Sequence, residues 1–216
     1  AGAVRTPEGA ILETDPSLHY PPGTLTEQQL GASNAELFTQ NSANVFRRFP
    51  RELTESMVRF YTGALALRSL NPIQLTSTQQ MILTAVGSGQ VKLSAGQQGN
   101  RSYNLSGGVS GGTGIRYLRF TYPDAATVAA RFAEAGFPEP RFAAMEDRLE
   151  ALVTDPAGLP ILIVIAPGVA DHSDNGVGVG VGVSDLEAST RFYRDFVGLA
   201  AQPAESSATL GLTIHP

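Results

Sequence analysis

The chain has 216 residues, with 15 Lys and Arg against 20 Asp and Glu, a formal net charge of −5, and no cysteine. This length can bury a sizeable core in one or two domains, and the absence of cysteine excludes disulfides and thiolate metal sites. The acidic balance without a basic stripe argues against a nucleic-acid partner, and no apolar run is long enough to span a bilayer, so no membrane partner is expected.

Residues 1–36 hold several prolines and glycines and show no helix or strand periodicity. This composition predicts an extended N-terminal arm. We expect the arm, with His19 and Tyr20, to pack on the surface of its own domain rather than to cover the mouth of a pocket. The chain begins Ala-Gly-Ala without methionine, and we favour a processed, exported (periplasmic or secreted) protein over a trimmed tag or a cloned fragment.

The next segment, from residue 37 to residue 113, is predicted to start with a strand at 44–49, NVFRRF. Pro50 suits the first turn of the helix that follows, Glu52–Leu67. Strands are then predicted at 73–86 and 90–95, where β-branched and polar residues mix. The loop 96–114 is rich in Gly, Ser and Asn, but it lacks the Lys-Ser/Thr ending of a phosphate-binding loop, so no nucleotide-triphosphate site is expected.

Residues 114–168 repeat this order of elements. An alternating strand at 115–122 ends in the capping residue Asp124, and a helix is predicted at 125–136. Three more strands are predicted around Arg141–Met145, Leu149–Thr154 and Ile161–Ala166. The short polar stretch at 169–176 is predicted to be a linker between domains.

A third strand and helix are predicted at 177–199. Valine alternates with glycine from Val177 to Val183, the period of a strand with one buried face. The glycine spacing does not match a dinucleotide-binding fingerprint, so the glycines are interpreted as one strand face that leaves room beside the backbone. Ser184 and Glu187 are predicted to form a capping box, followed by an amphipathic helix lying back on the sheet.

These three segments are copies of one unit. The helix at 52–67 and the helix at 184–199 both contain a Phe-Tyr pair, at an offset of 132 residues (192 − 60). At this offset five residue types coincide, namely Glu55, Arg59, Phe60, Tyr61 and Leu67 with Glu187, Arg191, Phe192, Tyr193 and Leu199. Asp124 aligns with Asp185 at 61 residues (185 − 124), so a supersecondary unit is used repeatedly.

The run VSDLEASTRFYRDFVGL resembles the opening of a module of the vicinal-oxygen-chelate (VOC) superfamily, which includes glyoxalases, bleomycin-resistance proteins and extradiol dioxygenases. DPAGLPILIVIAP at 155–167 resembles the closing strand of such a module. The resemblance implies an α+β fold in which paired βαβββ modules, 37–113 and 114–168, form one cup-shaped glyoxalase-like domain at 37–168. A partial second domain of the same kind follows at 177–216.

The partial domain has a first strand and helix but lacks most of its remaining strands, which leaves an open sheet edge. We favour a native chain that continues past Pro216. The alternative is a homodimer in which a second copy supplies the missing strands through the open module edge.

The resemblance also implies a divalent metal, held by His, Gln or Glu on first strands and by Glu on last strands. In this sequence those positions hold Tyr117, Gly178 and Leu162, and the first module offers no good ligand among residues 44–46. No metal and no other cofactor is therefore predicted in the complete domain. The three histidines, His19, His172 and His215, do not change this expectation, because they fall in the arm, the linker and the chain end.

The phase set by the family's ligand position directs Tyr117, Arg119 and Thr121 toward the cavity. Leu162 and Val164 are expected to line it from the partner strand. An apolar cavity with one Tyr and one Arg suits a small ligand with an aromatic or aliphatic body and an anionic or carbonyl end. The alternative left open is that Arg119 pairs with a carboxylate such as Glu146 or Glu150, and that side chains fill the cavity.

Three functions remain open at this stage. The favoured one is a metal-free VOC protein of the bleomycin-resistance type, with a small organic molecule as its ligand and no catalytic residue assigned. The second is a metal-dependent VOC enzyme (a lyase, an isomerase or a ring-cleaving dioxygenase) whose site lies in the incomplete second domain. The third is a structural or interaction module without a ligand.

Overall fold

The structure is a computed structural model that describes residues 3–5, 11–13, 44–77, 80–87, 89–96, 107–169 and 176–216. In the arm, β1 (Ala3–Arg5) and β2 (Ile11–Glu13) pair antiparallel. His19, Tyr20, His172 and most of the loop predicted at 96–114 and of the linker predicted at 169–176 lie outside the described residues. None of the described helices is both long and apolar enough to cross a membrane.

The first module starts with β3 (Asn44–Phe49), whose side chains alternate between exposed and buried as NVFRRF predicts. Its helix has three parts: a 3-10 turn η2 (Arg51–Leu53), α2 (Thr54–Val58) and the π-helical segment η3 (Arg59–Ala64). The strands that follow are β4 (Arg68–Ser69), β5 (Ile73–Gln74), β6 (Gln80–Val86) and β7 (Gly89–Ala95). The single strand predicted at 73–86 is therefore two strands, which pair with each other.

The second module contains the 3-10 turn η4 (Gly108–Ser110), β8 (Gly114–Tyr122), α3 (Ala125–Glu134), β9 (Ala143–Ala144), β10 (Leu149–Thr154) and β11 (Pro160–Ile165). In both modules the first strand lies parallel to the last one, giving the orders β3-β7-β6-β4 and β8-β11-β10-β9. The predicted α+β fold of repeated βαβββ modules is confirmed.

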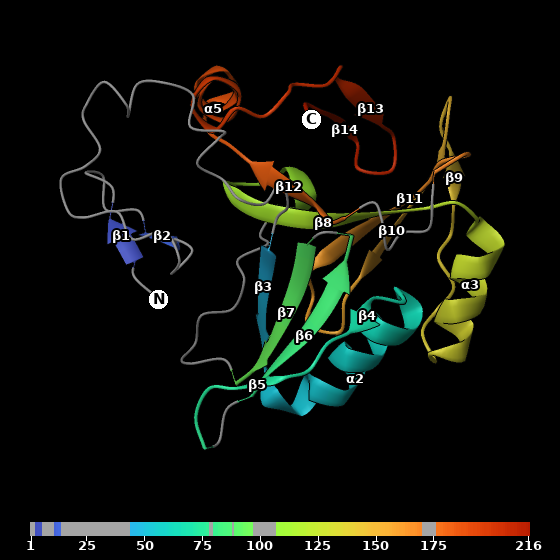
Figure 1. Ribbon diagram of the computed structural model, residues 1–216. Helices are drawn as coiled ribbons and strands as arrows, with labels where there is room; N and C mark the ends of the chain where they lie inside the picture. The colour runs from blue at the N-terminus through green and yellow to red at the C-terminus, as the bar shows by residue number, and fades with distance from the viewer. Residues whose placement is uncertain are drawn as a thin grey trace.

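The third segment contains β12 (Gly178–Gly182), α5 (Leu186–Arg191) and the π-helical segment η5 (Phe192–Val197). The predicted cap on Ser184 is wrong: Asp185 is the N-cap, and its Oδ1 accepts from the Ala188 N–H at 2.9 Å. The last two strands, β13 (Glu205–Ser207) and β14 (Leu212–Ile214), pair only with each other and form a hairpin (Figure 1).

Backbone geometry supports the predicted repeat, because the two Phe-Tyr helices end in the same turn. The N–H of Leu67 donates to the Tyr61 carbonyl at 2.9 Å, and the N–H of Leu199 donates to the Tyr193 carbonyl at 3.0 Å. In each copy the residue before the leucine has a positive φ. The two residues are Ala66, at 54°, and Gly198, at 84°.

The edge pairing of the modules differs from the expected cup between 37–113 and 114–168. Strand β8 pairs antiparallel with β12 of the third segment, while β3 stays in its own sheet. The domain boundary expected at 169–176 therefore separates, in sequence, two strands that are hydrogen-bonded to each other, β8 and β12. The physical reason is the glycine face of β12, which lets its backbone lie close to the bulky side chains of β8.

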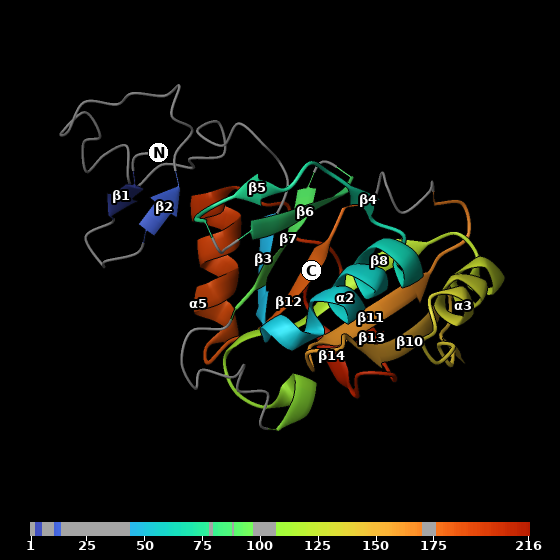
Figure 2. The same ribbon diagram turned by 90° about the horizontal axis from the view of Figure 1, so that it is seen from below.

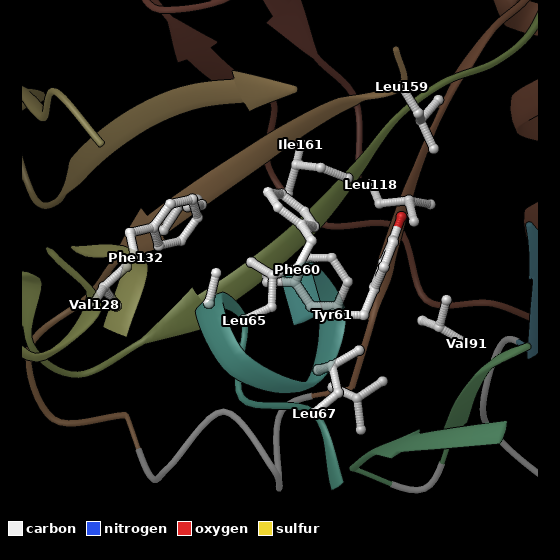
Figure 3. Packing of buried hydrophobic residues seen from close by; sticks show 14 of the residues in the cluster. Phe60, Tyr61, Leu65, Leu67, Val91, Leu118, Val128, Phe132, Leu159 and Ile161 are labelled. Carbon is white, nitrogen blue, oxygen red and sulfur yellow. The ribbon is translucent and has the colours of Figure 1, made fainter. Parts of the chain in front are cut away.

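The first two modules are joined instead through one shared hydrophobic core. Figure 3 shows Phe60 and Tyr61 of η3 pointing toward Leu118 and Ile161 of the second sheet. The ring of Phe60 lies edge-on to that of Phe132 on α3, with their centroids 5.7 Å apart. Burial of these aromatic rings makes modules one and two a single packing unit.

The helix of the third segment does not lie back on a sheet as predicted. None of the residues of α5 or η5 is buried, and Phe192 is 50% exposed, whereas its counterpart Phe60 is 1% exposed. Figure 2 shows α5 at the side of the molecule, away from α2 and α3. The amphipathic pattern therefore predicted the helix correctly but not its contact, because none of the described elements covers this face.

Candidate functional site

The candidate site lies on the sheet β12-β8-β11-β10-β9, on the face turned away from the shared core. We call this the site face and define it by the five predicted residues Tyr117, Arg119, Thr121, Leu162 and Val164. Their neighbours on the same strands, among them Leu118, Phe120, Ile161 and Ile163, belong to the shared core. The predicted alternation is confirmed, since Tyr117, Leu162 and Val164 belong to a second, separate hydrophobic cluster.

Strand β12 extends the site face beside β8, and its glycines allow this. Gly178 pairs with Arg119 and Gly180 pairs with Tyr117. A Cβ atom on Gly180 would overlap the Tyr117 ring, and one on Gly178 would lie 3.1 Å from the Arg119 Cβ. The interpretation that these glycines leave room beside the backbone is therefore confirmed, and the room is taken by the two site residues.

The hairpin β13–β14 covers part of the site face. Leu210, in its turn, is buried in one cluster with Tyr117, Leu162 and Val164, and Leu212 and Ile214 pack against that cluster. Figure 1 shows the hairpin on the side of β8 opposite to the first module. The second hydrophobic cluster thus exists because a segment from the end of the chain lies on the sheet.

Charged groups connect the same hairpin to the sheet. Arg119 Nη1 donates to Glu205 Oε2 at 3.1 Å, and Arg148 Nη2 lies 3.4 Å from the same oxygen. Arg148 Nε also donates to Glu150 Oε1 at 2.8 Å, and the Ser207 hydroxyl donates to Glu150 Oε2 at 2.6 Å. The carboxylate that pairs with Arg119 is therefore Glu205, and not Glu146 or Glu150 as the alternative supposed.

Sequence reasoning did not find Arg148, Glu150 and Glu205 as a group. Arg119 and Glu205 are 86 residues apart, and no local pattern relates them. The alternation of β10 was available as a signal, because it directs Glu150 to the opposite face from the core residue Ala151. Pairing of β10 with β11 then brings Glu150 directly beside Val164.

The surroundings shift the ionisation of two of these groups. Burial raises the pKa of the Tyr117 hydroxyl, and the carboxylates of Glu150 and Glu205 add to this against the opposing effect of Arg119. Desolvation acts to lower the pKa of Arg148, but the hydrogen bond and charge of Glu150, with Glu205 and Asp147, outweigh it, so the pKa is raised. At neutral pH the Tyr117 phenol is therefore neutral and the Arg148 guanidinium is charged.

The residues at the customary metal positions do not fit a metal ion. Leu162 and Gly178 have no donor atom in their side chains, and Tyr117 keeps its proton, which makes it a poor ligand for a hard cation. Across the described ranges, no group of three or more His, Asp and Glu side chains is arranged to hold a metal. We therefore derive no chemical step through a metal at this site.

Asp155, in the DP motif, has a structural role at the junction of the two modules. Its Oδ1 accepts from the backbone N–H groups of Ala157 and Leu159 at 2.9 Å each, which fixes the turn before β11. Arg47 of β3 donates to both carboxylate oxygens at 2.8 and 3.0 Å, and the Tyr61 hydroxyl donates to Oδ2 at 3.1 Å. Burial beside this carboxylate raises the pKa of Tyr61 well above its usual value.

A small pocket away from the site face lies at the start of α3, between Tyr122, Asp124 and Arg131. Asp124 is the helix N-cap there, and hydrogen bonds from Thr127 hold the pKa of its carboxyl below the usual value. The pocket is lined by the end of β8 (Tyr122), by the cap and by the first turns of α3, and we assign it no role. His215, the described histidine, is exposed at the chain end.

Solved structures share this fold. Glyoxalase I from Zea mays is 16% identical and superposes with a TM-score of 0.57, covering 80% of this chain and 60% of that chain. A putative dioxygenase from Bacillus subtilis is 14% identical, with a TM-score of 0.53, and covers 80% of this chain and 61% of that chain. These likenesses establish the VOC fold for this chain, which spans about 60% of the length of those structures. No protein-family model and no curated protein matches the sequence.

Proposed function

We propose that the chain is a small-molecule-binding protein of VOC fold, whose ligand lies on the site face without a metal ion. The observation that supports this most strongly is that Tyr117, Arg119, Leu162 and Val164 share one sheet face that the protein's main core does not use. That face combines a fully buried apolar floor with a partly exposed guanidinium. Ligand sites typically have this composition, a mainly apolar lining with a few convergent polar groups.

Each residue has a distinct task in this proposal. Leu162 and Val164 are fully buried and form the floor against which the body of the ligand packs. The Tyr117 hydroxyl stays protonated at neutral pH and donates a hydrogen bond to a carbonyl or carboxylate oxygen. Arg119 pairs with the anionic or carbonyl end of the ligand.

The metal-dependent alternative receives no specific support from this site. VOC enzymes use the metal to hold and polarise vicinal substrate oxygens, and the side chains at the corresponding positions here, Leu162 and Gly178, lack donor atoms. What the site offers is orientation, desolvation and charge pairing, which suit sequestration or carriage of a ligand, as in the bleomycin-resistance branch that the sequence resembles.

A ligand screen on the whole chain tests the proposal. Methyl groups of leucine and valine are labelled with ¹³C, and small aromatic and aliphatic acids, amides and alcohols are added at millimolar concentration. Binding on the site face is expected to shift the methyl signals of Leu162 and Val164. The substitution Arg119→Ala is expected to weaken the binding of acids at least tenfold, since a hydrogen bond to a charged group is lost.

Arg191→Ala is the matched control. Arg191 is also an arginine in an ion pair, with Glu187 on α5, but it is more than half exposed and lies off the site face. It should leave the affinity unchanged. Compounds that shift other methyl groups instead, or a stoichiometric divalent ion that shifts the methyl signals of Leu162 and Val164, would contradict the proposal.

A further inference from the structure

The hairpin β13–β14 presents to the site face the two kinds of group that a ligand of this site would present. Leu210 is an aliphatic side chain packed against Tyr117, Leu162 and Val164. Glu205, in the same hairpin, is a carboxylate bonded to Arg119 and close to Arg148. An apolar group and an anion, held by one small element, thus occupy adjoining parts of the site face.

The charges under the hairpin are balanced only while Glu205 is present. Arg119 and Arg148 face Glu150 and Glu205, so the four groups sum to zero. If the hairpin leaves, Arg148 keeps Glu150, but Arg119 has no carboxylate in this group. Asp147 also contacts Arg148, but its side chain is 74% exposed, so water screens its charge.

Attachment of the hairpin to the sheet depends on side chains. Strands β13 and β14 have three residues each and pair only with each other. Besides the apolar contacts, the polar contacts between the hairpin and the sheet in the described part of the chain are the Glu205 ion pairs, the Ser207–Glu150 hydrogen bond and a hydrogen bond from Arg148 to the Ser206 carbonyl at 3.2 Å. The hairpin can therefore leave the sheet without breaking a backbone ladder between strands.

One polar group in the hairpin is poorly satisfied. The Thr209 hydroxyl oxygen is buried and has no hydrogen-bond partner in the described part of the chain. A buried hydroxyl without a partner is unfavourable relative to its hydrated state. The position of the hairpin on the sheet therefore includes the unfavourable desolvation of this hydroxyl, which water hydrates when the hairpin moves away.

We propose that Arg119 and Arg148 form a subsite for the carboxylate of an apolar monocarboxylate ligand, and that the hairpin β13–β14 occupies this subsite as an internal competitor until the ligand displaces it. This inference rests on the proposed function, and it adds the chemical class of the ligand and the way it enters. Glu205 stands where the ligand carboxylate binds, and Leu210 stands where its apolar body binds.

Competition makes the apparent affinity depend on how often the hairpin is away from the sheet. The test uses three acids as probes, hexanoate, phenylacetate and 4-phenylbutyrate, each compared with its primary amide. Dissociation constants come from the methyl shifts of Leu162 and Val164. The wild-type chain is expected to prefer each acid to its amide by about tenfold, because only the acid forms a charge-assisted bond with Arg119.

Glu205→Gln keeps the shape of the side chain but removes the charge that competes with the ligand. It is expected to tighten binding of the acids at least fivefold. Glu187→Gln is the matched control, because it removes the same charge from an exposed ion pair on α5 and should leave binding unchanged. Displacement has its own readout, since the nuclear Overhauser contacts between the Leu210 methyls and those of Leu162 and Val164 should disappear when the acid saturates the site.

Several results would overturn the inference. Equal affinity for acids and amides would remove the anion subsite, and an unchanged or weaker affinity in Glu205→Gln would remove the competition. Persistence of the Leu210 contacts at saturation would show that ligand and hairpin bind together. In each of these cases a neutral compound that still shifts Leu162 and Val164 leaves the proposed function standing, whereas no shift with any compound refutes both.

Discussion

The substitution Asp155→Ala tests how the first two modules are held together. The Asp155 carboxylate is fully buried and accepts five hydrogen bonds, from two Arg47 nitrogens, the Tyr61 hydroxyl and two backbone N–H groups. Removing it leaves the Arg47 guanidinium, whose side chain is only 4% exposed, without its counter-charge. Breaking such a buried pair costs about 3–5 kcal/mol, a large part of the stability of an ordinary domain.

The measurement is urea unfolding at equilibrium, followed by far-ultraviolet circular dichroism and by tyrosine fluorescence, because the chain has no tryptophan. The double variant Arg47→Met with Asp155→Ala should recover part of the loss, since it removes the uncompensated charge. Glu187→Ala, which breaks an exposed pair on α5, should leave the unfolding midpoint unchanged. A loss below about 1 kcal/mol for Asp155→Ala would refute the reasoning.

Two further predictions concern glycine positions. Gly180→Ala is expected to lower the free energy of unfolding by about 1–3 kcal/mol, because the new Cβ overlaps the Tyr117 ring. In a Tyr117→Ala background the same substitution should leave the free energy of unfolding in the urea assay nearly unchanged. An equal loss in both backgrounds would contradict the pairing of β12 with β8. Gly198→Ala should lower the free energy of unfolding by about 1 kcal/mol, and Ala66→Gly should raise it by up to about 1 kcal/mol, because both positions have a positive φ. If the same assay showed Gly198→Ala to be stabilising or Ala66→Gly to be destabilising, the two turns would not be equivalent.

Local patterns predicted most of the elements of this fold. The alternation in NVFRRF and in 115–122 predicted strands β3 and β8 together with the face each side chain takes, because a strand has a fixed period of two. The repeated Phe-Tyr pair predicted two helices that prove to end in the same turn. The single strand predicted at 73–86 is wrong, because β5 ends at Gln74, β6 begins at Gln80, and the two strands pair antiparallel.

The candidate site, like the fold, was only partly predictable from the sequence. The phase implied by the family resemblance predicted that Tyr117, Arg119, Leu162 and Val164 share one face, and the regular alternation and the parallel pairing of β8 with β11 place them there. Their role in binding stays a prediction. The partner of Arg119 was missed, because Glu205 comes from a hairpin whose residues carry no signal for where the hairpin lies.

By itself the sequence determined the repeated unit and the faces of the strands, which follow from short-range spacing. The family resemblance added the α+β class and the customary metal positions, of which Gly178 and Leu162 have no donor atom in their side chains. Only the tertiary structure decided that β12, and not β3, pairs with β8, that Asp155 joins the first two modules, and that the hairpin covers the site face. Such contacts join residues about 50 to 110 positions apart, and they depend on how shapes and charges fit once the chain has folded.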